Sequence, residues 1–138
     1  MIDLTDEQQL LLQTVRRLVE EQVVPRAADI DETDEFPWDL YELFCRQGLT
    51  SLLIPEEWGG GGTDITTAAM VVEEVARASA AASIILAVQA SGPLFLSAGS
   101  SKQRQKYLPQ IAREKIVAIS LTEPEAGSDA VAIQTRAT

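Results

Sequence analysis

The sequence predicts a mainly α-helical fold that continues into the first strands of a β structure. Over most of residues 5–115, apolar residues recur three or four positions apart, which is the spacing of one face of a helix. Residues 116–121 are instead rich in β-branched residues and lead into Glu123-Pro124, as a buried strand does where it enters a turn. We therefore expect an α-helical domain over residues 1–115 and the beginning of a β domain over residues 116–138.

Composition limits the function classes that remain open. The chain has 138 residues, of which 46% are hydrophobic, so it can bury a core. Its net charge of -10 argues against nucleic acid and anionic membranes as partners, because both require clustered Lys and Arg. It has no histidine and one cysteine, Cys45, which excludes a Ser-His-Asp triad, a Cys-His pair and the usual zinc sites. We expect no metal site, and we interpret Cys45 as a small core residue.

Location is predicted from three further features. A single cysteine gives no disulfide framework, and the N-terminus shows neither a charged leader nor an apolar signal core. The longest apolar stretch, residues 83–97, is interrupted by Gln89, Gly92 and Pro93 and is predicted to be too short for a bilayer span. The expected location is the bacterial cytoplasm rather than the mitochondrial matrix.

The first two helices are predicted from their ends. Thr5 and Gln8 form a capping-box pattern, and the apolar spacing that follows predicts an amphipathic helix up to Pro25. Its polar face, with Arg16, Arg17, Glu20 and Glu21, is interpreted as solvated surface. The acidic run 29–35 is predicted to be a loop, and a second helix is expected from Pro37 to a glycine C-cap at Gly48.

Four consecutive glycines, 59–62, precede the third predicted helix. No Lys-Ser/Thr pair follows them, so we interpret 55–62 as a structural turn with a packed Trp58 rather than a phosphate-binding loop. Asp64 or Thr63 should cap a helix over about 65–78. Its adjacent Glu73 and Glu74 point about 100° apart, so they cannot converge on one bond and are interpreted as solvated.

Two more helices complete the helical domain. Residues 80–91 are small and apolar all round, which is typical of a helix buried on most sides. Ser101 should cap a polar helix that carries Lys102, Arg104 and Lys106, and Pro109 should restart a short turn through Ala112.

The turn that follows the predicted strand is the candidate ligand site. Gly127 permits close approach, and the amides of residues 126–129 join the Thr122 and Ser128 hydroxyls as donors for an anionic or carbonyl-rich ligand. The alternative is an ordinary loop in which Ser128 and Asp129 bond their own backbone.

Nine consecutive residues of this region, Leu121-Thr-Glu-Pro-Glu-Ala-Gly-Ser-Asp129, resemble the signature loop of the acyl-CoA dehydrogenases. Four upstream segments fall in that family's order and at its usual separations, so the resemblance covers essentially the whole chain. These segments are Phe36-Pro37, Pro55-Glu-Glu-Trp-Gly-Gly60, Glu73-Glu-Val-Ala-Arg77 and Lys102-Gln-Arg-Gln-Lys-Tyr-Leu-Pro109.

The resemblance implies a fold, a cofactor and a reaction. The fold is the family's N-terminal helical domain plus the first strands of its β-barrel-like middle domain, and the reaction is FAD-dependent α,β-dehydrogenation of an acyl-CoA thioester. Leu121 and Thr122 would lie beside the isoalloxazine, Ala126 and Gly127 would also contact the cofactor, and Ser128 would reach the pyrophosphate and the substrate. Gln89 and Ser91 would lie near the acyl tail, although plain helix packing explains the small side chains around them equally well.

The resemblance also implies what the chain lacks. The family's catalytic glutamate, its second flavin-contacting strand and its C-terminal helical bundle have no counterpart here, so we expect a fragment that is inactive alone. An electron-transfer flavoprotein would accept the electrons, and the full-length protein would be a homotetramer or homodimer. Two alternatives remain: a flavin-dependent acyl-CoA oxidase or monooxygenase of the same fold, and a non-catalytic helical module or half of a split assembly.

Overall fold

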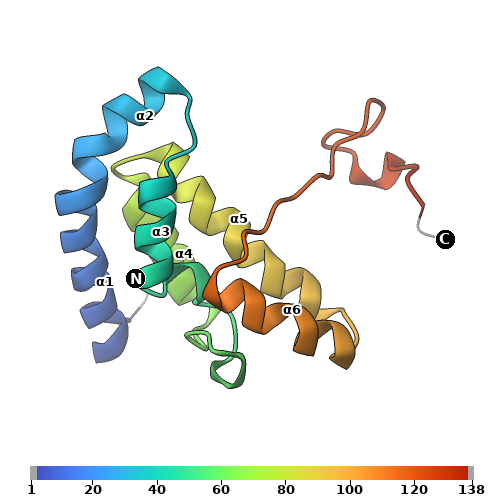
Figure 1. The fold of residues 1–138 in the computed structure, drawn as a ribbon, viewed down its shortest axis with the longest axis horizontal. Helices are drawn as coiled ribbons and strands as arrows, with labels where there is room; N and C mark the ends of the chain where they lie inside the picture. The colour runs from blue at the N-terminus through green and yellow to red at the C-terminus, as the bar shows by residue number, and fades with distance from the viewer. Residues whose placement is uncertain (1–2, 137–138) are drawn as a thin grey trace.

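The computed structural model describes residues 3–136, which form a helical body and a segment that leaves it (Figure 1). Beyond the last helix the chain runs away from the body and ends in a loop. The mainly α-helical prediction is confirmed. The α-helices of the described residues are α1 (Asp6–Leu18), α2 (Ala27–Thr33), α3 (Trp38–Arg46), α4 (Ile65–Ala76), α5 (Ala80–Ser97) and α6 (Ser101–Arg113).

The N-terminal helical segment, from α1 to α2, is longer than predicted. Helix α1 begins at the expected capping box, in which Thr5 Oγ1 accepts from the Gln8 amide at 3.2 Å. A π turn (Val19–Val23) and a 3-10 turn (Val24–Arg26) join it to α2. The loop predicted for residues 29–35 is therefore wrong over most of its length. Pro25 lies in the first turn of the new helical segment, where its missing N–H is not needed, and burial of Ile30 anchors α2.

The core lies between the helices of the body. Helix α4 packs against both α1 and α5, and its Val71 and Val75 are fully buried. Helix α3 contributes Phe44, also fully buried, while Cys45 is half-buried against this core. The helical segment from α1 to α2 and helix α5 complete the core. Their core residues are Val15, Val19, Val23, Ile30, Ala82, Ile85 and Leu86.

Helix α5 departs from its prediction in length and in burial. It continues past residue 91, through Pro93, to Ser97. Its buried face carries Ala82, Leu86 and Gln89, but the prediction of burial on most sides is wrong within the described residues. Ile84, Leu94 and Phe95 are 53% to 63% exposed.

The same helix is long and apolar enough to cross a membrane by length and composition. Its 18 residues have a mean hydropathy of 1.6, so the prediction that this stretch is too short for a span is wrong. The core helix of a soluble protein can be equally long and apolar. In this structure 39% of the Ala80–Ser97 helix is buried.

The strands expected at 116–121 and 131–138 do not form among the described residues. Residues 116–122 are extended without a strand partner, an isolated antiparallel bridge joins Glu123 to Ala126, and Ala130–Ala132 is a 3-10 turn. Residues 137–138 lie outside the described part. A strand requires a neighbour to pair its backbone groups, and residues 3–136 supply none. The division at residue 115 stays a prediction.

The glycine-rich segment is a structural turn, as predicted. Gly59 and Gly62 have φ angles of 86° and 60°, a left-handed conformation that favours glycine, and Trp58 is half-buried. The Asp64 carboxylate accepts from the Thr67 amide at 2.7 Å and so caps α4. Gly60 is required for a different reason, its close packing: a Cβ built there would lie 2.1 Å from the Ile54 carbonyl oxygen.

We expect Gly60→Ala to destabilise the chain by about 2 kcal/mol or more, because its methyl group would strike backbone that cannot move independently. Gly61→Ala is the matched control, since a Cβ there meets its nearest atom at 3.4 Å. Urea unfolding of both variants gives the comparison. Equal midpoints for the two would contradict the packing described for this turn.

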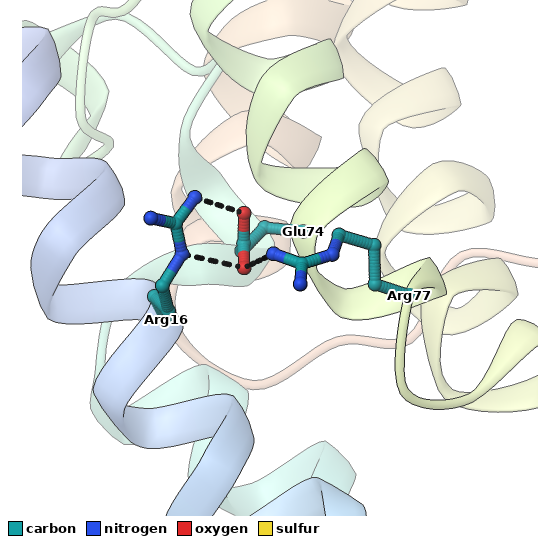
Figure 2. Close-up of polar contacts among 3 residues, drawn as sticks. All are labelled: Arg16, Glu74 and Arg77. Atoms are coloured by element: carbon teal, nitrogen blue, oxygen red, sulfur yellow. Dashed lines mark hydrogen bonds and ion pairs between the residues drawn. The ribbon is translucent and has the colours of Figure 1, made fainter.

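An ion-pair cluster joins α1 to α4 (Figure 2). The Arg16 Nε and Nη2 atoms donate to the two Glu74 carboxylate oxygens at 3.0 and 2.9 Å, and Arg77 Nη1 donates to Oε1 at 2.7 Å. Glu74 is 7% exposed, so its predicted place on a solvated face is wrong. It lies between Val71 and Val75 on the buried side of α4, and Arg16 is bound rather than simply solvated.

The cluster lowers the pKa of Glu74. The hydrogen bonds from Arg16 are the main cause, burial opposes them, and the charges of both arginines add to the effect. A carboxyl whose pKa is lowered by folding adds stability above its ordinary pKa and loses that stability as the pH falls.

We expect Glu74→Gln to lower the free energy of unfolding by about 1 to 2 kcal/mol near neutral pH. This is less than for a fully buried pair, because both arginine side chains are more than half exposed. The difference from wild type should begin to shrink as the pH falls below about 4.3, where the carboxyl of the unfolded chain takes up a proton. It should disappear at lower pH, once the native carboxyl with its lowered pKa is also protonated. Urea unfolding as a function of pH measures this, with exposed Glu73→Gln as control. A pH-independent difference would contradict the charge-based account.

Candidate functional site

The loop at the end of the extended segment is built on a tight turn. The Glu123 amide donates to the Ala126 carbonyl at 3.0 Å, and the Ala126 amide donates back to the Glu123 carbonyl at 3.1 Å. Pro124, directly after Glu123, has the fixed φ that suits this position of a turn. The Ala126 side chain is 1% exposed, so the turn has a small packed interior of its own.

The Glu123 carboxylate closes a wider loop around this turn. Its two oxygens accept from the backbone amides of Gln134 and Thr135 at 2.9 and 3.0 Å. Hydrogen bonds to a charged acceptor are stronger than those between neutral groups. Bonds from Thr135, and then from the Gln134 amide, lower the pKa of Glu123. This role of Glu123 could not be predicted from the sequence, since its partners lie 11 and 12 residues along the chain.

The predicted cofactor residues lie together on this loop, and their side chains differ in exposure. Leu121 is 57% exposed, and Thr122, Gly127 and Ser128 are also exposed, whereas Ala126 is buried. A Cβ built on Gly127 meets no atom within 4 Å, so the space beside it is open. Neither the Thr122 nor the Ser128 hydroxyl makes a hydrogen bond within residues 3–136. The loop therefore presents two hydroxyls and an open backbone to an incoming group.

The predicted substrate residues on α5 lie apart from the loop. Figure 1 shows α5 within the helical body and the loop at the far end of the extended segment. Gln89 is 1% exposed, and each polar atom of its carboxamide makes a hydrogen bond: Nε2 donates to the Lys115 carbonyl at 2.7 Å, and Oε1 accepts from the Val117 amide at 2.9 Å. The Ser91 hydroxyl donates to the Val88 carbonyl of its own helix. A contact of either residue with an acyl chain stays a prediction.

Two apolar grooves lie on either side of the segment that leaves α6. The larger has a volume of about 600 Å³, within the range of small-molecule sites. The smaller, about 420 Å³, is lined by Gly92, Phe95, Tyr107 and Ile111. Ile116 and Val117 line both grooves and so separate them. The larger groove is also lined by three acidic residues, Asp31, Asp34 and Glu35, and by the apolar residues Ile30, Phe36, Ala81, Ile84, Val88 and Ile119.

The larger groove could not be predicted from the sequence. Ile84 and Val88 are four residues apart, so their spacing places them on one face of α5. Their contribution to a groove depends on Phe36 and Ile119, which lie far away in the sequence. Within the described residues, no group of three or more His, Cys, Asp or Glu side chains is placed to hold a metal ion.

Comparison with known proteins places the chain in a family. The family model for the N-terminal domain of acyl-CoA dehydrogenases matches residues 5–115. Over 140 residues the chain is 44% identical to cyclohex-1-ene-1-carbonyl-CoA dehydrogenase of Syntrophus aciditrophicus (strain SB), covering 99% of this chain and 34% of that relative. The chain spans about a third of the length of the curated relatives it matches.

Solved structures agree. The chain matches glutaryl-coenzyme A dehydrogenase, in its glutaryl-CoA complex, with a TM-score of 0.86 and 34% identity, covering 96% of this chain and 35% of that one. It matches an acyl-CoA dehydrogenase of Bacillus anthracis complexed with FAD with a TM-score of 0.82 and 31% identity, covering 96% of this chain and 23% of that one.

The chain belongs to the acyl-CoA dehydrogenase family, and its residues 5–115 match that family's N-terminal domain. The resemblance inferred from the sequence is thereby confirmed.

We expect the Glu123 carboxylate to control the amides that close the loop. In NMR spectra, the Gln134 and Thr135 amide shifts should titrate with a pKa below the ordinary glutamate range, and Glu123→Gln should abolish this titration. Glu125→Gln, which alters an exposed carboxylate in the same turn, should leave it unchanged. Persistence of the titration in Glu123→Gln would contradict the closure.

Proposed function

We propose that this chain forms one wall of the flavin site in an FAD-dependent acyl-CoA dehydrogenase. One observation carries the proposal: a loop held closed by Glu123 presents the open backbone at Gly127 together with the unbonded Thr122 and Ser128 hydroxyls. Hydroxyl and amide donors suit a pyrophosphate, and the exposed Leu121 side chain suits the face of an aromatic ring.

Each residue of the loop has a separate task in this proposal. Ser128 donates to a pyrophosphate oxygen, Thr122 donates near the isoalloxazine ring, and Gly127 leaves room for the cofactor. Bound FAD supplies a two-electron acceptor for the α,β-dehydrogenation of an acyl-CoA thioester. No residue of the chain is assigned as the base, so residues 1–138 alone should not turn over any acyl-CoA.

The partners follow from the same proposal. The substrate is an acyl-CoA, and the electrons pass to an electron-transfer flavoprotein. The chain carries 21 acidic and 11 basic residues, so the basic contacts of the polyanionic coenzyme A should come from other segments of the enzyme. We propose that the complete enzyme is a homodimer or homotetramer.

The test is a chimera in which the whole chain replaces the matching third of the Syntrophus aciditrophicus relative. Ser128→Ala should lower its affinity for FAD roughly tenfold to hundredfold, the value of a hydrogen bond to a charged group. Thr122→Val should change the flavin absorbance and its rate of reduction more than its occupancy. Ser97→Ala is the matched control, because that exposed hydroxyl bonds only its own helix.

Two results would overturn the proposal. One is a folded wild-type chimera that binds no FAD. The other is full flavin content, unaltered absorbance and unaltered reduction kinetics in both loop variants, which would make this segment an ordinary turn.

A further inference from the structure

The chain leaves the helical body through a short segment, residues 114–117, that we call the strap. Three side-chain hydrogen bonds hold it. The Tyr41 hydroxyl of α3 donates to the Glu114 carbonyl at 3.1 Å, and the Gln89 carboxamide of α5 bonds both the Lys115 carbonyl and the Val117 amide. Two helices thus fix the place where the extended segment begins.

The Gln89 side chain makes the two backbone hydrogen bonds that a neighbouring parallel strand would make. In a parallel sheet, one residue donates to the carbonyl before its partner and accepts from the amide after it. Gln89 does the same with its carboxamide, donating to Lys115 and accepting from Val117, on either side of Ile116. This single buried group therefore holds Ile116 in an extended conformation where the described residues contain no strand.

The extended segment beyond the strap has no hydrogen-bonded support from the body within the described residues. Residues 118–122 make no backbone hydrogen bond within the described part of the chain, and the next such bonds are internal to the loop, between Glu123 and Ala126. An extended chain rises about 3.3 Å per residue, so a small rotation at Val117 moves the loop by a much larger distance. The direction of the loop thus depends on the strap.

Tyr41 supports the same segment from the other side. Its ring is 7% exposed, and burial, as the main cause, raises the pKa of Tyr41 to about 12. The hydroxyl is therefore protonated and able to donate at any ordinary pH. Because Tyr41→Phe removes only this oxygen, it is a milder change than removal of the Gln89 carboxamide.

We propose that Gln89, assisted by Tyr41, is a positioning residue: it fixes the direction of the strap and so places the loop 121–128 against the flavin. This inference rests on the proposed function and gives Gln89 a task other than contact with the acyl chain. Both polar atoms of its carboxamide are occupied, and the side chain does not line the larger apolar groove. Its role is exerted through the strap rather than by touching the cofactor.

The test uses the same chimera with Gln89→Met, which keeps the shape of the side chain and removes both hydrogen bonds. We expect roughly a tenfold loss of FAD affinity. We also expect a shifted flavin absorbance and a lower kcat when FAD is saturating, with little change in the KM for the acyl-CoA. Tyr41→Phe should shift the same quantities in the same direction by a smaller factor.

Two controls separate positioning from general stability. Ser83→Ala removes a hydroxyl from a buried residue of α5. That hydroxyl bonds only the Ala80 carbonyl of its own helix. Val71→Ala weakens the fully buried core without touching the strap. Both should leave the absorbance of the bound flavin unchanged, even where they lower the midpoint of unfolding.

The outcomes distinguish this inference from the proposed function. If the wild-type chimera binds FAD and both Gln89→Met and Tyr41→Phe match Ser83→Ala in affinity, absorbance and kcat, only the positioning role is overturned. The same holds if Val71→Ala shifts the flavin absorbance as far as Gln89→Met does. A wild-type chimera without FAD overturns both.

Discussion

The helical body depends on the buried face of α4. Val71 and Val75 fill the space between α1 and α5, and Glu74 on the same face ties α1 to α4 through Arg16. Apolar burial supplies the driving force without direction, whereas the paired hydrogen bonds between guanidinium and carboxylate fix the register of the two helices.

What could be predicted from the sequence was local. Thr5 and Asp64 cap helices in the structure as their patterns indicate, since a cap and its target amide are three residues apart. The pairing of Arg16 with Glu74 could not be predicted, because 58 residues separate them and both lie in helices with ordinary charged faces. The extension of α5 through Pro93 was missed because a proline inside a helical pattern is normally taken as its end.

The candidate site also has a part that could be predicted from local sequence and a part that could not. Nine consecutive residues were enough to indicate the family, and the cofactor residues predicted from them lie on one loop. The bonds that shape this loop and hold its base come from Glu123, Gln89 and Tyr41, with partners 11 to 73 residues away in the sequence. A side chain that replaces a strand leaves no periodic pattern, so Gln89 resembled any other polar residue in a small apolar helix.

The exposed apolar residues of α5 have a consequence for the behaviour of the chain in solution. Ile84, Leu94 and Phe95 expose apolar area, and contact between such areas on two molecules would be favourable. Each molecule also carries a net charge of -10, whose repulsion keeps copies apart in dilute buffer. At 1 M salt the screening length falls to about 3 Å, which leaves that repulsion too short-ranged to oppose contact. Low salt should therefore favour separate molecules of this chain, and high salt should favour their contact.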